Sequence, residues 1–187
     1  MVYPVHIIGS SVLRKKAVEI NKDYPNLKEF IENMYETMYS SDGVGLAAPQ
    51  VGKAIRLFVI DATPMEEEIP ELKGFKRTFI NAIITEKSED MTRSEEGCLS
   101  IPEVREDVAR HTSLTIEYFD ENFDQKIEKL EGMAAVIIQH EYDHLDGILF
   151  TDKVSALRKK FLKRKLANIA KGNFNRRYKF ILGEKFR

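Results

Sequence analysis

Several stretches of the chain place apolar residues at the spacing of helices or strands. Residues 26–40 carry them at every third or fourth position, which predicts an amphipathic helix packed on a core. Residues 56–60 and 78–84 are short, mostly apolar runs that predict two strands, expected to pair in one sheet. Residues 113–119 and 125–130 alternate in part on either side of a polar turn, which predicts an antiparallel hairpin. The pattern therefore predicts a domain that contains both helices and strands.

Two more helices are predicted in the second half of the chain. The segment between Gly132 and Gly147 opens with consecutive apolar residues and predicts a buried helix, which the second glycine is suited to end. Residues 153–171 predict a further helix, and the segment after it is expected to add a short strand or to be partly loose. A glycine-punctuated loop is expected at 43–52. The apolar face of the last helix is predicted to contain Val154, Leu157, Phe161, Leu162, Leu166 and Ile169.

The composition is typical of a folded protein without a membrane partner. The 187-residue chain is 43% hydrophobic and 32% charged, which suits one domain with a real core. No stretch approaches 18 apolar residues, and the first residues have neither the basic start nor the apolar run of an export signal. Cys98 is the only cysteine, so no internal disulfide can form. A cytoplasmic location is therefore expected.

The net charge of −1 hides an uneven distribution along the chain. Residues 151–187 contain thirteen Lys or Arg against two acidic residues, a balance of +11, and residues 1–150 therefore carry −12. We divide the chain into an acidic body, 1–150, and a basic C-terminal helix and tail, 151–187, as parts of one domain. A basic helix is more often a solvated face than a binding surface, but it can also attract phosphate groups.

The segment 139–147, Gln-His-Glu-Tyr-Asp-His-Leu-Asp-Gly, carries the strongest chemical pattern in the chain. At about 100° per residue, His140 and His144 lie one helical turn apart and about 40° apart around the axis, so both imidazoles can reach one metal ion. Glu141 lies beside them, badly placed as a tight ligand but well placed to take a proton from a water molecule on the metal. This arrangement predicts a metal-dependent hydrolase.

Two histidines leave such a metal short of one ligand, because catalytic zinc-like sites use three protein ligands and keep one position open. No histidine follows His144. Among the acidic residues downstream, Asp146 lies too near on the same helix end, and Asp152 and Glu184 are the other candidates. Upstream, Cys98 follows a glycine that allows close approach of the backbone. A thiolate from Cys98 is therefore the favoured third ligand, and such a ligand set argues against magnesium or calcium.

Three segments together resemble the signature motifs of the peptide deformylase family. They are Gly43-Val44-Gly45-Leu46-Ala47-Ala48-Pro49-Gln50, Glu96-Gly97-Cys98-Leu99-Ser100 and the histidine segment 139–147, in the order and rough spacing of that family. The resemblance implies a catalytic body, 1–150, that removes the N-formyl group from the N-terminal methionine of nascent polypeptides and releases formate. It also implies an α+β fold in which small antiparallel β-sheets surround a central helix that carries the histidines. The C-terminal helix predicted above adds to this fold.

The resemblance also implies a role for each motif residue. Cys98, His140 and His144 would bind one divalent ion, by preference Fe2+, with Zn2+, Ni2+ or Co2+ able to occupy the same site. Glu141 would act as the general base and pass the proton to the departing amine. The side-chain N–H of Gln50 and the backbone N–H of Leu99 would stabilise the charge that develops on the formyl oxygen.

Substrate contacts are predicted partly from spacing and partly from the resemblance. Counting back from His140, Val136 and Met133 share the histidine-bearing face of the helix and would form an apolar wall suited to a methionine side chain. Ile137 would flank this wall, although a place in the core fits it equally well. Two glycines of the first motif would let a peptide pass close to the backbone, and the resemblance adds an arginine near the cleft. The predicted substrate-binding residues are Gly43, Gly45, Arg105, Met133, Val136 and Ile137.

Three polar residues near the motifs are expected to have supporting roles. Glu96 and Arg110 are predicted to form an ion pair that orients the segment containing the cysteine. Asp143 lies on the opposite flank of the helix from Glu141 and is expected to make structural hydrogen bonds.

The expected partners are the substrate and a molecule that binds the basic tail. N-formyl-methionyl nascent peptides are the expected substrates, and no DNA partner is expected. The resemblance shifts the interpretation of the basic helix toward contact with ribosomal RNA, through Lys159, Lys160, Lys163, Arg164 and their neighbours. Two other functions stay open on the pattern alone. One is an endopeptidase of the His-Glu-x-x-His type, and the other is a non-catalytic, metal-stabilised RNA-binding module.

Overall fold

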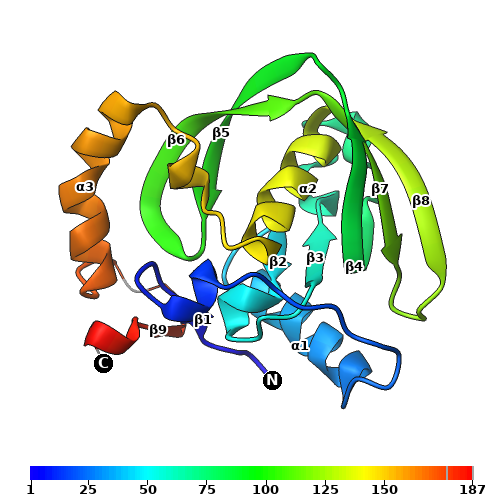
Figure 1. The fold of residues 1–187 in the computed structure, drawn as a ribbon, viewed down its shortest axis with the longest axis horizontal. Coiled ribbons are helices and arrows are strands. Elements are labelled where there is room, and N and C mark those ends of the chain that lie inside the picture. The colour runs from blue at the N-terminus through cyan, green and yellow to red at the C-terminus, as the bar shows by residue number, and fades with distance from the viewer. Residues whose placement is uncertain (176, 187) are drawn as a thin grey trace.

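A five-stranded antiparallel sheet with a helix packed against each face forms the body of the molecule (Figure 1). The computed structural model describes residues 1–175 and 177–186. Its strands are β1 (Val5–His6), β2 (Gly45–Ala47), β3 (Leu57–Asp61), β4 (Lys76–Lys87), β5 (Met91–Cys98), β6 (Ile101–His111), β7 (Ser113–Phe119), β8 (Gln125–Glu131) and β9 (Phe180–Ile181). Its α-helices are α1 (Leu27–Tyr39), α2 (Gly132–Leu145) and α3 (Ala156–Ala170). The strand order in the sheet is β2-β3-β4-β7-β8.

Strand β3 shows why both faces of the sheet are covered. All of its residues are buried, so it has no side that faces solvent. Phe58 and Ile60 belong to a core cluster shared with α2, whereas Leu57 and Val59 belong to a cluster shared with α1. Because successive side chains of a strand point to opposite faces, one apolar run packs against two helices at once. The predicted helix at 26–40 and the two predicted strands are confirmed, with slightly different ends.

Two predictions about the neighbouring segments have different outcomes. The hairpin expected from residues 113–119 and 125–130 is confirmed as β7 and β8. The segment 43–52 is not a loop throughout, as predicted, because Gly45–Ala47 pair with β3 and Ala48–Val51 form a 3-10 turn. The glycines of this segment favoured the prediction of a loop, but pairing with β3 stabilises a short strand here.

The hairpin of β5 and β6 flanks α2 on the side away from the sheet (Figure 1). The hydrophobic pattern did not predict it, because two of the inward positions of β6 are charged. Glu106 and Arg110 are buried there, alternating with Val104 and Val108. Since each charge is paired inside the protein, the strand tolerates a break in its apolar alternation.

Helix α2 lies in the middle of the molecule, between the sheet and this hairpin (Figure 1), and carries both histidines of the motif. The predicted stop at Gly147 is confirmed: its φ of 72° lies in the left-handed region, and a side chain there would lie 2.7 Å from the carbonyl oxygen of Arg14. The predicted α+β class, with small antiparallel sheets around a central helix, is confirmed as well. The pair of β1 and β9 is an exception, since these two strands are parallel.

Helix α3 is confirmed, but its predicted apolar face was partly wrong. Leu162 and Ile169 are buried, whereas Leu157 and Phe161 are 62% and 67% exposed. The inward positions nearest to them are taken by charged side chains that bind the hairpin. Arg158 donates two hydrogen bonds, of 2.6 and 2.8 Å, to the carboxylate of Glu106. The buried face of α3 is therefore rotated relative to the one predicted from apolar residues alone.

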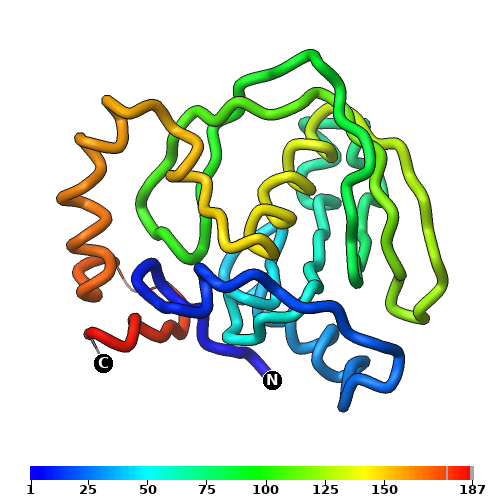
Figure 2. The backbone as a smooth tube through the Cα atoms, in the orientation of Figure 1, coloured from blue at the N-terminus to red at the C-terminus, as the bar shows by residue number. Residues whose placement is uncertain are grey.

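The C-terminal tail returns to the start of the chain, so that β9 lies beside β1 (Figure 2). The short strand considered for this segment is therefore present. Two of the basic residues counted in the tail, Arg176 and Arg187, lie outside the described residues. Among the residues that are described, no helix is long and apolar enough to cross a membrane.

Candidate active site

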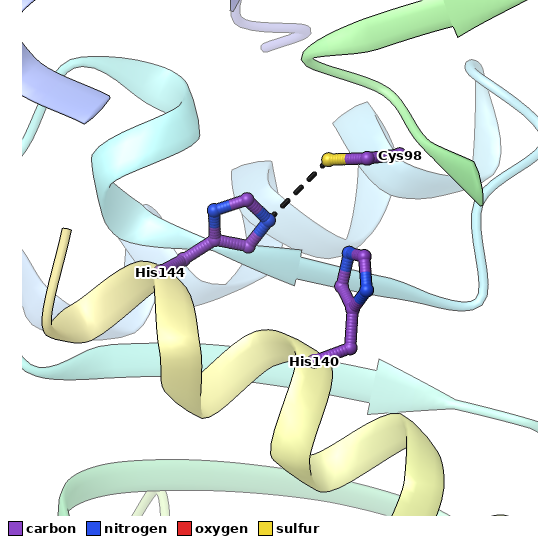
Figure 3. Close-up of side chains that lie close together, drawn as sticks. All are labelled: Cys98, His140 and His144. Atoms are coloured by element: carbon purple, nitrogen blue, oxygen red, sulfur yellow. Dashed lines mark hydrogen bonds between the residues drawn. The ribbon is translucent and has the colours of Figure 1, made fainter. Parts of the chain in front are cut away.

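Three side chains with metal-binding atoms converge where the end of β5 meets α2 (Figure 3). They belong to Cys98, His140 and His144, and their ligand atoms lie within 4.8 Å of one another. The Sγ atom of Cys98 lies 3.3 Å from Nε2 of His144. The structure thus brings together the three residues that were predicted as ligands.

The tip of the hairpin directs the cysteine toward α2. The pairing of β5 with β6 shifts register after Gly97, and Cys98 then pairs with Ile101 across a two-residue turn. An irregularity of this kind bends a strand and changes the direction of a side chain. The thiol can therefore face the histidines, although it ends a strand whose other residues alternate.

A buried chain of charges holds His140 in place. Its Nδ1 lies 2.8 Å from Oε2 of Glu96, which leaves Nε2 for the side that faces Cys98. Arg110 binds both oxygens of Glu96, at 2.6 and 2.9 Å, and donates a further hydrogen bond of 2.6 Å to Asp143. The expected ion pair and the expected structural role of Asp143 are present, joined in one network. Burial alone would raise the pKa of Glu96, but the hydrogen bonds from Arg110 and His140 lower it to about 2.

Glu141 projects from the same helix and is 5% exposed. Burial, assisted by the nearby charge of Glu96, raises its pKa to about 7. A carboxylate with such a pKa can both accept and release a proton near neutral pH. Its Oε1 lies against Gly45, where an added Cβ would come within 2.3 Å, so a larger residue at this position of β2 would displace the carboxylate.

The chemistry of the group suits a cation. Burial opposes a charge on His140, yet its hydrogen bonds with Cys98 and Glu96 raise its pKa well above the usual value, so positive charge is favoured here. Burial lowers the pKa of His144, which keeps that imidazole neutral, as a metal ligand must be. Oε2 of Glu141 is buried and has no hydrogen-bond partner among the described residues. The residues present therefore fit a divalent metal ion.

Gln50 and Leu99, the predicted donors to the formyl oxygen, lie next to this group. Gln50 is 2% exposed, and its Oε1 accepts a hydrogen bond of 2.8 Å from the backbone N–H of Ala47. That bond directs Nε2 toward Sγ of Cys98, at 3.4 Å, and Oγ of Ser100, at 3.2 Å. Leu99 is the first residue of the turn after the cysteine. Both predicted donors thus line one cleft together with Cys98 and His140.

This cleft has a volume of about 610 Å³ and runs past the ligand group. All of the residues predicted to bind substrate line it, namely Gly43, Gly45, Arg105, Met133, Val136 and Ile137. Sequence reasoning missed other residues of the lining, among them Met65, Asn175, Arg177 and Tyr178. The last three come from the C-terminal tail, and no local pattern could have placed that segment beside the hairpin tip.

A histidine-bearing helix, a thiol opposite it and a buried glutamate at one end of a cleft define a metal-dependent hydrolase. The family model described as Polypeptide deformylase matches residues 2–160. The chain belongs to the peptide deformylase family. It is therefore an amide hydrolase that removes the N-formyl group from nascent polypeptides, and the Cys/His/His group agrees with the metal dependence of the family.

Individual relatives agree along the whole chain. Peptide deformylases of Flavobacterium psychrophilum and Flavobacterium johnsoniae are 54% and 53% identical, with all of both chains covered in each comparison. Among solved structures, the peptide deformylase of Thermotoga maritima is 41% identical with a TM-score of 0.75, covering 83% of this chain and 99% of its own. That of Plasmodium falciparum is 35% identical with a TM-score of 0.80, covering 90% and 95%.

Proposed function

We propose that Cys98, His140 and His144 hold the metal ion for the deformylation reaction, and that the native ion is Fe2+. Zn2+, Ni2+ or Co2+ would be able to take its place, because thiolate and imidazole suit all of these ions. The observation that carries the proposal is the approach of the three donor atoms to within 4.8 Å of one another. Elemental analysis of protein purified without oxygen tests the identity of the ion, and a zinc-only preparation would contradict it.

The remaining motif residues would handle the proton and the developing charge. The metal ion supplies activation of water and polarisation of the formyl carbonyl. Glu141 takes a proton from the attacking water and delivers it to the amine as the C–N bond breaks and formate leaves. The formyl oxygen accepts hydrogen bonds from Nε2 of Gln50 and from the backbone N–H of Leu99. The raised pKa of Glu141 supports its role, since the group must both gain and lose this proton.

The edge of the sheet supports extended binding of the peptide. Among the described residues, strand β2 pairs with β3 alone and forms an edge of the sheet, and Gly45 of β2 lines the cleft. A peptide paired along this edge would bind through its backbone, which tolerates many sequences. Met133, Val136 and Ile137 would receive the methionine side chain, and Arg105, whose side chain is 70% exposed, would contact the peptide farther out.

Three substrates separate deformylation from the two other functions. We expect formate from a formyl-Met-peptide, no reaction with the acetyl-Met-peptide and no cleavage of the unmodified peptide. Internal cleavage would indicate an endopeptidase, and inertness toward all three would indicate a binding module. We expect Glu141→Ala to keep the metal but to lower kcat by about 10²- to 10⁴-fold, as general acid–base groups typically contribute. Retained turnover would contradict the role of Glu141.

We also propose that the basic helix α3 contacts ribosomal RNA, which would place the enzyme in the cytoplasm beside nascent chains. Lys159, Lys160, Lys163 and Arg164 are all exposed. Arg158 differs from them, because it is tied to the carboxylate of Glu106. The cations that remain on the outer surface of the helix support binding to phosphate groups.

Charge reversal tests this contact. The variant Lys160→Glu/Lys163→Glu/Arg164→Glu is expected to lose binding to ribosomes in a sedimentation assay, and wild-type binding is expected to weaken as salt is raised. Its kcat/KM on a short formyl-peptide should not change. A matched control reverses three exposed lysines elsewhere on the surface, Lys22, Lys28 and Lys129. Equal loss of binding in both variants, or in neither, would contradict a contact through α3.

A further inference from the structure

The C-terminal tail reaches the hairpin tip through one tyrosine. The hydroxyl of Tyr178 donates a hydrogen bond to the carbonyl oxygen of Leu99. Tyr178 is half-buried and lines the same cleft as the metal-binding group. The contact joins residues that are 79 positions apart in the chain, and Tyr178 lies beyond residue 160, where the match to the family model ends.

Every residue of the turn that follows Cys98 is held by a different part of the protein. The carbonyl oxygen of Ser100 accepts a hydrogen bond of 2.8 Å from the backbone N–H of Ile8. The hydroxyl of Ser100 lies 3.2 Å from Nε2 of Gln50. Leu99 lies between the cysteine and this serine, and its carbonyl group is held by Tyr178. Removing the tyrosine hydroxyl would therefore release only Leu99, the first residue of the turn.

The segment that carries Tyr178 is itself fixed on both sides. After it, β9 pairs with β1, and the N–H groups of Val5 and Ile7 each donate a 2.9 Å hydrogen bond to tail carbonyls. Before it, the backbone N–H of Asn175 donates a 2.9 Å hydrogen bond to Glu103 on the hairpin. The hydroxyl is thus held in position by the backbone on either side, and it needs no substrate to bring it there.

We propose that Tyr178 is a positioning residue for the hydrolysis, which orients the backbone N–H of Leu99 toward the formyl oxygen. The N–H and the carbonyl of Leu99 belong to adjacent peptide planes that meet at one Cα atom. With Cys98 held on the other side, fixing the carbonyl restricts rotation about both backbone bonds of Leu99. The tail thereby takes part in catalysis without touching the substrate. The inference rests on the proposed role of the Leu99 N–H as a donor.

The variant Tyr178→Phe tests the inference in the metal-loaded, full-length enzyme. It removes only the hydroxyl and keeps the ring, which packs against the core cluster that contains Ile101 and Val104. Displacement of a catalytic group by about 1 Å can cost up to about 100-fold in rate, and a loosened turn moves less, so we expect kcat to fall about 10-fold. The KM for a formyl-Met-peptide and the metal content should stay within about twofold of the wild-type values, because neither the apolar wall nor the ligands change.

Tyr35→Phe is the matched control. Tyr35 is also half-buried, and its hydroxyl lies 3.2 Å from Oγ1 of Thr78, away from the cleft. Both variants lose one hydroxyl, so a general loss of stability would affect both, whereas only Tyr178→Phe should lower kcat. A kcat within twofold of wild type, an effect on KM alone or a loss explained wholly by missing metal would each overturn the inference.

A second measurement does not depend on activity. Backbone 15N relaxation, measured by NMR, gives order parameters that report the mobility of Leu99 and Ser100 directly. In Tyr178→Phe the order parameters of these two residues should fall, while those in the strands of the central sheet stay the same. Unchanged order parameters at Leu99 would overturn the inference even if kcat fell. If the wild-type enzyme released no formate, the proposed function would fail, but this relaxation measurement would still decide whether Tyr178 restrains the turn.

Discussion

At the scale of single residues, Glu96 supports two other side chains of the site at once. One carboxylate orients His140 and neutralises Arg110; the side chains of Arg110 and His140 are 2% and 11% exposed. Removal of one member of a buried ion pair leaves an uncompensated charge, which costs about 3–5 kcal/mol. The sequence allowed the pair of Glu96 and Arg110 to be predicted. The link to His140 required the fold, because the register of β5 against α2 decides it.

Acid should weaken this network in a defined range of pH. The pKa of Glu96 is lowered from 4.5 to about 2, so its contribution to stability is complete above pH 4.5 and is lost as the pH falls toward 2. At pH 7 we expect Glu96→Gln to reduce the free energy of unfolding by about 3 kcal/mol. The difference from wild type should shrink between pH 5 and pH 2, measured by urea unfolding at several pH values. A difference that stays constant with pH would contradict this assignment.

Gly45 offers a second test at the residue scale. A Cβ at this position would lie 2.3 Å from Oε1 of Glu141, so Gly45→Ala should displace the carboxylate and lower kcat by about 100-fold with the metal retained. Gly43→Ala, in the same cleft, is the comparison variant: its Cβ would meet only the end of the Leu99 side chain, at 3.1 Å, so its loss of kcat should be smaller. Formate release and metal content measured for both variants check the expectation. Equal losses of kcat would argue against the close contact with Glu141.

At the scale of elements, helices and strands were predicted correctly where the apolar residues of the pattern are also the residues that the structure buries. Helix α1 and strand β3 bury apolar faces, and both were expected. Strand β6 was not predicted because Glu106 and Arg110 occupy inward positions. The buried face of α3 was predicted incorrectly because a charged residue, Arg158, binds the hairpin there. The convergence of Cys98, His140 and His144 could be predicted, because two of them share one helix and the chain has only one cysteine. The position of Tyr178 beside the cleft could not be predicted, because the folding back of the tail leaves no local pattern in the sequence.

Helix α3 contains both apolar residues that are buried, as predicted, and apolar residues that are exposed, and their contributions to stability can be compared. Leu162 is 7% exposed and packs in the cluster with the hairpin, so Leu162→Ala should lower the free energy of unfolding by about 2–4 kcal/mol. Phe161→Ala on the exposed side should change it by no more than about 0.5 kcal/mol. Urea unfolding of both variants provides the measurement. A larger loss for Phe161→Ala would mean that a partner covers this side in solution.

At the scale of the whole molecule, the basic tail and the acidic body are tied together at several points. Arg14 pairs with Asp152, the hydroxyl of Ser11 donates a 2.9 Å hydrogen bond to Glu184, and β1 pairs with β9. We propose that residues 1–150 and 151–187 form one domain, since a cluster of apolar residues also spans both segments.

One domain should unfold in one step. The chain has seven tyrosines and no tryptophan, so tyrosine fluorescence reports on tertiary structure while circular dichroism reports on the helices and strands. We expect both signals to give the same midpoint in urea, as a two-state transition requires. A separate, earlier transition of the tail would show that the two segments are distinct units.

The pairing of β1 with β9 has a consequence for the time at which the enzyme becomes complete. A protein chain leaves the ribosome from its N-terminus, so Val5 and Ile7 emerge long before the tail carbonyls that they bind. Until then the hairpin tip lacks its contact with Tyr178. An enzyme that processes growing chains therefore completes its own cleft only after the segment that carries Tyr178 has itself been synthesised.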